Sequence, residues 1–225
     1  MAKINSINNK SGSLEIDPGA SGDSYVQFSI NGTGEFRIGV DDDDGDAFKI
    51  SQGSALGSND CFVMSAAGEC NLPLTPAFNV KGTDNGQALN VTGDGTSYQL
   101  YSVSSLLADE VFDQNSDFSI DTFTAPITGK YILFCALQII GITPDHYAEF
   151  HVTTSNGTYQ VKKNDLYFFS GGSSSIYSGK VFVDMDTSDT ATINLIVSGG
   201  SKVIGIQSGT LSNGQPTFIQ GKLIC

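Results

Sequence analysis

Clusters of turn-forming residues interrupt the first third of this sequence at short intervals. Between residues 17 and 69 the clusters read DPGASGD, NGTGE, DDDDGD, SQGSALGSND and AAGE. The segments between them carry apolar residues at every second position, beginning with Val26, Phe28 and Ile30. Alternation of period two bounded by turn signals indicates short β-strands. This region is therefore expected to form a β meander, with VQFSINGTGEFRIGV as its clearest hairpin.

The composition extends this expectation to the whole chain. The 225 residues include 26 Gly, 14 Phe and 8 Tyr. Aromatic side chains suit a half-buried pleated surface, and Gly supplies the positive φ angles of tight turns. An all-β fold without long helices is expected.

A segment with two prolines, LPLTPAFNV at residues 72 to 80, separates two regions of different character. Proline removes a ladder donor and marks a joint between modules, so the boundary is placed near Leu74. Residues 1–74 hold few large apolar side chains and are expected to depend on another surface for burial. Residues 75–225 are richer in apolar strands, about ten of them, which is the count of a two-sheet jelly-roll sandwich.

The charge of the chain excludes two classes of partner. The formal net charge is −13, and Arg37 is the only arginine. Nucleic acid and anionic lipid are bound by clustered Lys and Arg, so neither is expected here. The N-terminus is polar, and the longest apolar run, YILFCALQIIGI, is interrupted by Gln138. We expect neither a secretory signal nor membrane insertion.

The sequence carries no recognisable catalytic motif. Neither of its two histidines, His146 and His151, lies in a triad context, and no G-x-S-x-G, H-E-x-x-H or phosphate-binding loop is present. We expect no enzyme and no cofactor. The four cysteines lack zinc-ligand spacing, and free thiols are favoured over a disulfide between Cys61 and Cys70.

An acidic run from Asp41 to Asp44, with Asp46, raises the alternative of a calcium site because oxygen ligands hold hard cations. The run does not fit an EF-hand loop, because the twelfth position of such a loop is a Glu and here it would be Ser51. A charged solvated turn is the favoured interpretation. Three such runs around a threefold axis would be the arrangement that demands a cation.

The middle of the chain resembles a known family. Phe123, Pro126, Gly129, Tyr131 and Phe134 resemble the F-x-x-P-x-x-G-x-Y-x-F signature of the globular head of complement component 1q, within the tumour necrosis factor-like jelly rolls. PAFNV at residues 76 to 80 is similar to the first strand of that family, and FIQGKL at residues 218 to 223 to its closing F-x-x-G-x-L. The aromatic at position 134 comes one residue late, which suggests a bulge in that strand.

This resemblance implies a homotrimer whose sheet faces pack around a threefold axis. The run YILFCALQIIGI is apolar on both faces, as a strand between its own core and a neighbouring chain would be. Burial inside a single sandwich is the alternative. The expected trimer core consists of Phe123, Tyr131, Phe134, Leu137 and Phe218.

The N-terminal region resembles a segment of bacteriophage tail and neck fibre proteins. The resemblance covers residues 17 to 69 and is carried by FRIGVDD, DAFKIS and GSALG. It implies a structural role in which three chains wrap into a thin β shaft, and shared burial would order a segment with so little core of its own.

A loop at residues 165 to 179, DLYFFSGGSSSIYSG, combines aromatic and small polar side chains, as paratopes and sugar sites do. Tyr167, Tyr177, Ser173 and Ser174 are the expected ligand contacts. The sequence thus predicts a phage virion fibre protein, assembled in the host cytoplasm, that attaches to other virion proteins through its N-terminal region. Its trimeric head would bind a glycan or protein of the host surface. The alternatives are a purely structural virion protein and a secreted complement-type recognition protein.

Overall fold

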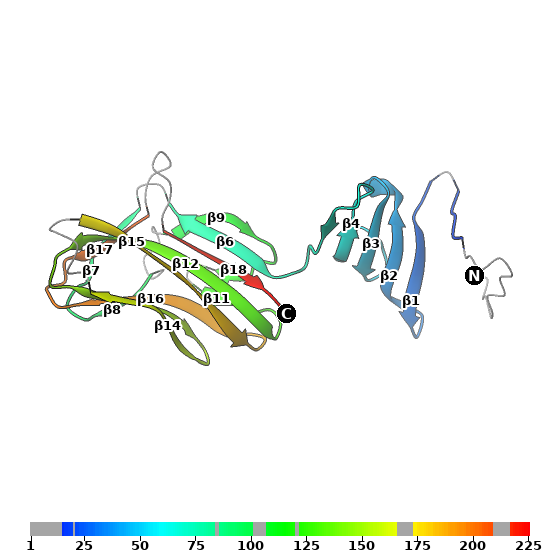
Figure 1. The fold of residues 1–225 in the computed structure, drawn as a ribbon. Coiled ribbons are helices and arrows are strands. Elements are labelled where there is room, and N and C mark those ends of the chain that lie inside the picture. Colours follow the sequence, from blue (N-terminus) through cyan, green and yellow to red (C-terminus); the bar gives the residue numbers. More distant parts are fainter. Residues whose placement is uncertain are drawn as a thin grey trace. The chain divides into compact units, whose positions relative to one another are not determined.

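The computed structural model describes residues 15–19, 21–83, 86–100, 107–119, 122–165, 173–208 and 217–225. The chain divides into two compact units, Met1–Leu74 and Thr75–Cys225 (Figure 1). Strands dominate both units, which makes the fold all-β as expected. Across the ranges described, no helix has the length and apolar character needed to span a membrane.

The N-terminal unit is a single antiparallel sheet in which each strand pairs with the next along the chain. This is the predicted meander. Its elements are β1 (Ser24–Ile30), β2 (Thr33–Asp41), the short 3-10 turn η1 (Asp42–Asp44), β3 (Ala47–Gln52), β4 (Asp60–Met64) and β5 (Cys70–Asn71).

The register of this sheet sorts its side chains onto two different faces. Across β1 to β4 the pairs Val26↔Ile38, Ile38↔Ile50 and Ile50↔Phe62 align apolar residues on one face. Phe28, which is 57% exposed, lies on the same face. The opposite face holds the buried Lys49 and Ser51. One face of the meander is therefore apolar and, among the residues described for this unit, uncovered.

The C-terminal unit is a sandwich of a six-stranded and a seven-stranded antiparallel sheet. The six-stranded sheet contains β8 (Ser97–Gln99), β10 (Phe118–Ser119), β11 (Thr122–Thr124), β13 (Tyr147–Thr154), β14 (Gly157–Asp165) and β16 (Thr190–Ser198). The seven-stranded sheet contains β6 (Ala77–Gly82), β7 (Gln87–Thr92), β9 (Leu107–Asp113), β12 (Gly129–Ile142), β15 (Ser173–Met185), β17 (Ile204–Gln207) and β18 (Phe218–Leu223).

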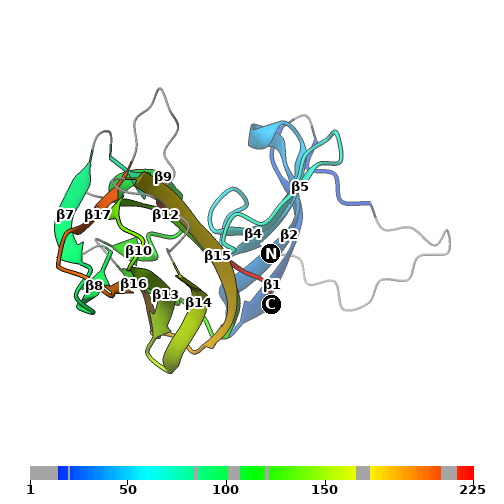
Figure 2. The same ribbon diagram turned by 60° about the vertical axis from the view of Figure 1, so that its left-hand side comes forward.

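The chain passes repeatedly from one sheet to the other, as in a jelly roll. The successive strands β11 and β12, β12 and β13, β14 and β15, and β15 and β16 all lie in different sheets. The first strand of the unit, β6, pairs with the last, β18. Figure 2 shows β12 and β15 in one layer facing β13, β14 and β16 in the other. The sandwich is confirmed, with thirteen strands among the described residues in place of the ten or so expected.

The core lies between the two sheets and is built around stacked aromatics. The Phe78 ring stacks on Phe118 at 5.1 Å and on Phe123 at 4.9 Å between centroids. Gly221 on β18 leaves room for this stack, because a Cβ there would lie 2.4 Å from Phe78 Cε1. The glycine of the closing sequence FIQGKL thus has a packing role in the core.

The turn before β12 is fixed by the chain itself. The Tyr131 hydroxyl donates a hydrogen bond to the Ile127 carbonyl at 2.7 Å. A Cβ at Gly129 would lie 2.7 Å from the Cys225 carbonyl oxygen, so glycine permits the close approach of the C-terminal strand. Pairing of β12 with β15 is regular from Gly129 to Ile139 and shifts only between Ile139 and Ile142. The bulge expected near residue 134 is therefore wrong.

The cysteines differ strongly in accessibility. Cys70 is exposed and lies opposite Met64 in the β4–β5 pairing, so it does not face Cys61. Cys135 on β12 is fully buried, and this burial raises the pKa of its thiol to about 12.

We expect the alkylating reagent iodoacetamide at pH 8 to label Cys70 within minutes and to leave Cys135 unlabelled in the folded protein. The reason is that the thiolate is the nucleophile, and the Cys135 thiol is both buried and protonated. Mass mapping of labelled peptides with and without denaturant measures this difference. Labelling of Cys135 at the rate of Cys70 in the folded state would contradict its placement in the core.

Candidate assembly surface

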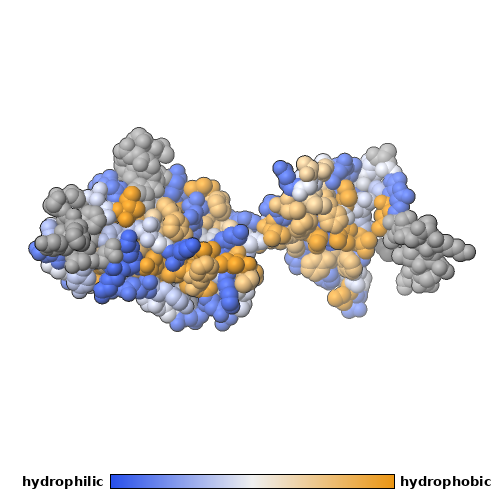
Figure 3. Space-filling view, viewed as in Figure 1, coloured by the Kyte–Doolittle hydropathy of each residue, from blue (hydrophilic) through white to orange (hydrophobic). Residues whose placement is uncertain are grey.

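The seven-stranded sheet presents apolar side chains on the face that points away from the six-stranded sheet. On β12, Tyr131 and Leu133 are buried inside the sandwich, whereas the alternate residues Ile132 and Phe134 point outward. We call this surface the outer face. Its large apolar side chains are Phe112, Ile132, Phe134, Ile176, Phe182 and Phe218, and orange side chains gather over this part of the unit in Figure 3.

Cross-strand pairs make the outer face continuous. Ile132 lies opposite Phe182 on β15, and the Phe134 ring packs against Phe218 on β18 with 5.4 Å between centroids. Phe182 is 63% exposed, an unusually high value for a Phe in the middle of a strand. A contiguous apolar sheet face of this kind marks a protein interaction surface.

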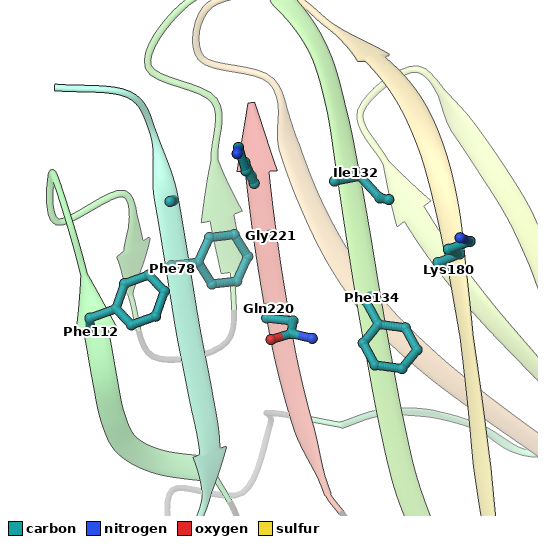
Figure 4. A pocket seen from close by; sticks show the side chains of 9 residues that line it. Phe78, Phe112, Ile132, Phe134, Lys180, Gln220 and Gly221 are labelled. Atoms are coloured by element: carbon teal, nitrogen blue, oxygen red, sulfur yellow. The ribbon is translucent and has the colours of Figure 1, made fainter. Parts of the chain in front are cut away.

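A hollow of about 510 Å³ lies on the outer face (Figure 4). Its residues come from five strands, β6, β9, β12, β15 and β18. Phe112, Ile132 and Phe134 contribute apolar surface, and Lys180 and Lys222 are the charged groups of its lining. Sequence reasoning missed both lysines and Phe182, because alternation in KVFVDM shows that two faces differ without showing which one faces the core.

The structure divides the five residues expected at a trimer core into two groups. Phe123, Tyr131 and Leu137 are buried within a single chain, at 1% exposure or less, so their assignment to a trimer interface is wrong. On β12 the odd-numbered residues from Tyr131 to Ile139 point between the sheets. Phe134 and Phe218 lie on the outer face and remain available to another chain.

Four residues at positions 165 to 179 were expected to contact a ligand, and the structure describes the side-chain surroundings of two of them, Ser174 and Tyr177. Tyr167 lies outside the described residues, and Ser173 is described only as the first residue of β15. Ser174 is exposed on β15. Tyr177 is 1% exposed and belongs to the core, beneath the Lys162 ammonium at 5.0 Å, so its assignment as a surface ligand contact is wrong.

The outward side of the six-stranded sheet is polar, in contrast to the outer face. On β13 and β14, Glu149 lies between two basic side chains: Lys163 donates a hydrogen bond to it, and His151 Nε2 is 3.5 Å from its Oε2. The hydrogen bond from Lys163 lowers the pKa of Glu149. Beside them, Asn194 Nδ2 donates to Thr153 Oγ1 at 3.0 Å. This side of the sandwich suits contact with solvent or with polar ligands.

The acidic run forms the charged turn that was expected, except at its first residue. Asp42, Asp43 and Asp44 form the exposed turn η1, but Asp41 is buried. Lys49, whose side chain is 4% exposed, donates to Asp41 Oδ2 at 2.8 Å and lies 2.6 Å from Asp44 Oδ2.

A third carboxylate completes this cluster from the next strand. Asp60 Oδ2 is 3.3 Å from Lys49 Nζ, and Asp60 Oδ1 accepts hydrogen bonds from Ser51 and from the Gly57 backbone. Burial lowers the pKa of Lys49, and hydrogen bonds to the three carboxylates more than offset this, so the pKa ends well above its usual value. The cation among these carboxylates is the chain's own ammonium. Within the ranges described, no group of three His, Cys, Asp or Glu side chains is arranged to hold a metal ion.

No protein-family model matches the sequence, and no curated protein matches it. Among solved structures, the globular domain of zebrafish complement 1qA protein is similar at 18% identity and a TM-score of 0.43, covering 67% of this chain and 98% of that chain. Murine APRIL at pH 8.0 is similar at 8% identity and a TM-score of 0.41, covering 66% and 98%. Eiger TNF from S. frugiperda is similar at 9% identity and a TM-score of 0.43, covering 67% and 94%.

Proposed function

We propose that this chain is a non-enzymatic virion fibre protein of a bacteriophage. Three copies associate through their sheet faces, the N-terminal unit forms a shaft that attaches to other virion proteins, and the jelly-roll head contacts a molecule of the host surface. The observation that carries the proposal is the apolar outer face of the seven-stranded sheet, which no described residue of this unit covers and whose composition is that of the core of a protein interface.

The N-terminal unit supports the same assembly. Its sheet has one apolar face with exposed Phe28 and Phe36, and its described residues supply no second layer to cover that face. A sheet of a few strands needs a packed face for independent stability. Burial of this face among three copies provides that packing, and the sequence resemblance to fibre segments agrees with it.

The head would recognise its host partner through surfaces that trimerisation leaves open. The polar side of the six-stranded sheet, with Glu149, His151 and Asn194, offers carboxylate, imidazole and amide groups suited to the hydroxyls of a glycan. Three weak sites on one rigid assembly gain avidity by effective concentration. This is the mechanism that a fibre head requires.

We expect the full chain to have a solution mass of three times 23.7 kDa, about 71 kDa, by size exclusion with light scattering. Phe134→Asp places a charge in the apolar outer face and is expected to lower the mass to that of one chain. Lys202→Glu, in the exposed connection between β16 and β17, is the matched control and should remain trimeric. A monomeric wild-type chain at micromolar concentration would reject the proposal.

The same two variants separate recognition from a purely structural role. Labelled wild-type protein and Lys202→Glu should bind intact bacterial cells of a susceptible strain, and periodate oxidation of the cells should abolish that binding if the partner is a glycan. Monomeric Phe134→Asp should bind at least about a hundredfold more weakly, because avidity is lost. A trimer that binds no strain of a panel supports the structural virion role instead.

A further inference from the structure

The only arginine of the chain, Arg37 on β2, is held in place by two side chains of β1. Its guanidinium lies over the Tyr25 ring, with 4.1 Å between Cζ and the ring centroid. Its Nε and Nη2 both donate to Gln27 Oε1, at 3.1 and 2.9 Å. Among the residues that the structure describes, Arg37 forms no ion pair, although the chain has 24 acids. The cation is therefore fixed in position without being neutralised.

Two glycines of β2 make room for the side chains that hold Arg37. A Cβ at Gly39 would lie 2.6 Å from Tyr25 Cβ, and a Cβ at Gly34 would lie 2.9 Å from Gln27 Nε2. Glycine weakens a strand, and within a strand it often marks a place where another group approaches closely. Here each glycine allows one residue of β1 to lie close against β2. The glycines and the two side chains together build the surroundings of the guanidinium.

The hydrogen bonds to Gln27 occupy one edge of the guanidinium and leave a second edge open. A guanidinium has five N–H groups, and Gln27 Oε1 accepts from the edge formed by Nε and Nη2. Within the described ranges no group accepts from the edge formed by Nη1 and Nη2, which presents two parallel N–H groups. Their spacing matches two oxygens of a carboxylate or a phosphate. Because Tyr25 and Gln27 already order the side chain, binding at this edge loses little free energy to ordering it.

The charge of the chain favours a single carboxylate over a phosphate at this edge. A phosphate monoester carries a charge of about −1.5 to −2 at neutral pH, and it would meet one cation here. The formal net charge of the chain is −13, so the excess negative charge would be repelled. A carboxylate carries one charge, which one guanidinium compensates. Polyanions are disfavoured by the same argument.

The neighbours of Arg37 favour a sugar acid over the acidic side chain of a protein. Gln27 and Ser29 beside it are exposed, and the Gln27 amide donates to Ser29 Oγ at 2.8 Å, so the serine hydroxyl can itself donate to a ligand. The large apolar side chains of this hairpin, such as Phe28 and Phe36, lie on the opposite face of the sheet. An arginine at the centre of a protein interface sits among apolar residues that exclude water. Polar groups around a charge suit the hydroxyls and the carboxylate of a sugar.

We propose that the N-terminal unit binds the carboxylate of an acidic sugar, a uronic or sialic acid, through the Nη1–Nη2 edge of Arg37. Gln27 and Ser29 contact the sugar hydroxyls. The site lies on the face opposite the apolar one, so burial of the apolar face among three copies leaves it accessible. A single chain supplies all of its residues, so the site does not depend on the trimer.

Binding of the full chain to immobilised sugar conjugates tests this proposal. Polyacrylamide conjugates of N-acetylneuraminic acid and of glucuronic acid are compared, by biolayer interferometry, with the same conjugates after amidation of the carboxylate. Wild-type protein should bind at least one acid conjugate about tenfold or more tightly than its amide. Arg37→Lys keeps the charge but loses the edge with two N–H groups, and should reduce this preference to about twofold or less. Lys202→Glu, an exposed charge change in the other unit, is the control and should keep the full preference.

The outcomes separate this site from the proposed trimer. Equal binding of acid and amide forms by the wild type, or no binding of either acid, overturns the proposal, as does an Arg37→Lys variant that is folded by circular dichroism and keeps the preference. Loss of virion attachment in Arg37→Lys, without any sugar binding by the wild type, would assign Arg37 to a protein partner instead. A monomeric wild-type chain that prefers the carboxylate supports this site and rejects the trimer.

Discussion

Replacing Lys49 by methionine is expected to destabilise the N-terminal meander by about 3 kcal/mol or more, enough to unfold a small sheet. Methionine fills a similar volume but removes the ammonium from between Asp41, Asp44 and Asp60. The side chains of Asp41 and Asp60 are 6% and 13% exposed, so water cannot replace the lost partner. Amide hydrogen exchange resolved to β2, β3 and β4 measures the effect where it occurs.

The matched control is Lys163→Met, which breaks the exposed pair with Glu149. Exposed pairs contribute about 0.2 to 1 kcal/mol, so exchange in β13 and β14 should change little. Because the folded-state pKa of Lys49 is raised, its stabilisation is complete below the usual lysine pKa of 10.5 and is lost only as pH rises through the higher folded value. Unchanged protection of the meander in Lys49→Met at neutral pH would show that the cluster adds no stability.

Phe123→Ala is expected to cost the jelly-roll head about 3 to 5 kcal/mol of unfolding free energy. The ring lies 4.9 Å from Phe78 and 5.3 Å from Tyr131 between centroids, in a part of the core that is 1% exposed or less. Its removal leaves a cavity among aromatics that cannot collapse easily. Denaturant unfolding at fixed protein concentration, with hydrogen exchange on β12 and β16, measures the loss.

Phe134→Ala serves as the comparison, because it removes the same kind of side chain from the outer face of the seven-stranded sheet and leaves the core intact. It should lower the trimer mass at a given concentration while leaving amide protection of β16 close to that of the wild type. Equal loss of core protection in the two variants would contradict the division of these aromatics between core and outer face.

Much of the architecture could be predicted from local pattern. The turn clusters and period-two alternation gave the meander and the long strand that became β12. Strand β7 was missed, because its sequence QALNVT does not alternate cleanly and its pairing with β17 is decided by residues far along the chain. Strand β17, with Ile204 and Ile206, was missed as well.

The candidate site was harder to predict than the fold. Alternation in YILF separates Tyr131 and Leu133 from Ile132 and Phe134, but it cannot say which pair faces a partner. The resemblance to the complement family assigned Tyr131 and Phe123 to the trimer, and burial within one chain corrected both. Lys180 and Lys222 look like ordinary surface charges in the sequence, since nothing local relates residues so far apart along the chain.

The sequence by itself determined the strand periods, the turns, the acidic balance and the absence of recognisable catalytic motifs, because these depend on neighbouring residues and on composition. Only the tertiary structure decided which face of each strand is inside, that Lys49 is the cation of the acidic cluster, and that two lysines share one apolar hollow. The physical reason is that burial and charge pairing are set by strand register across the sheets, and register joins residues that the sequence keeps far apart.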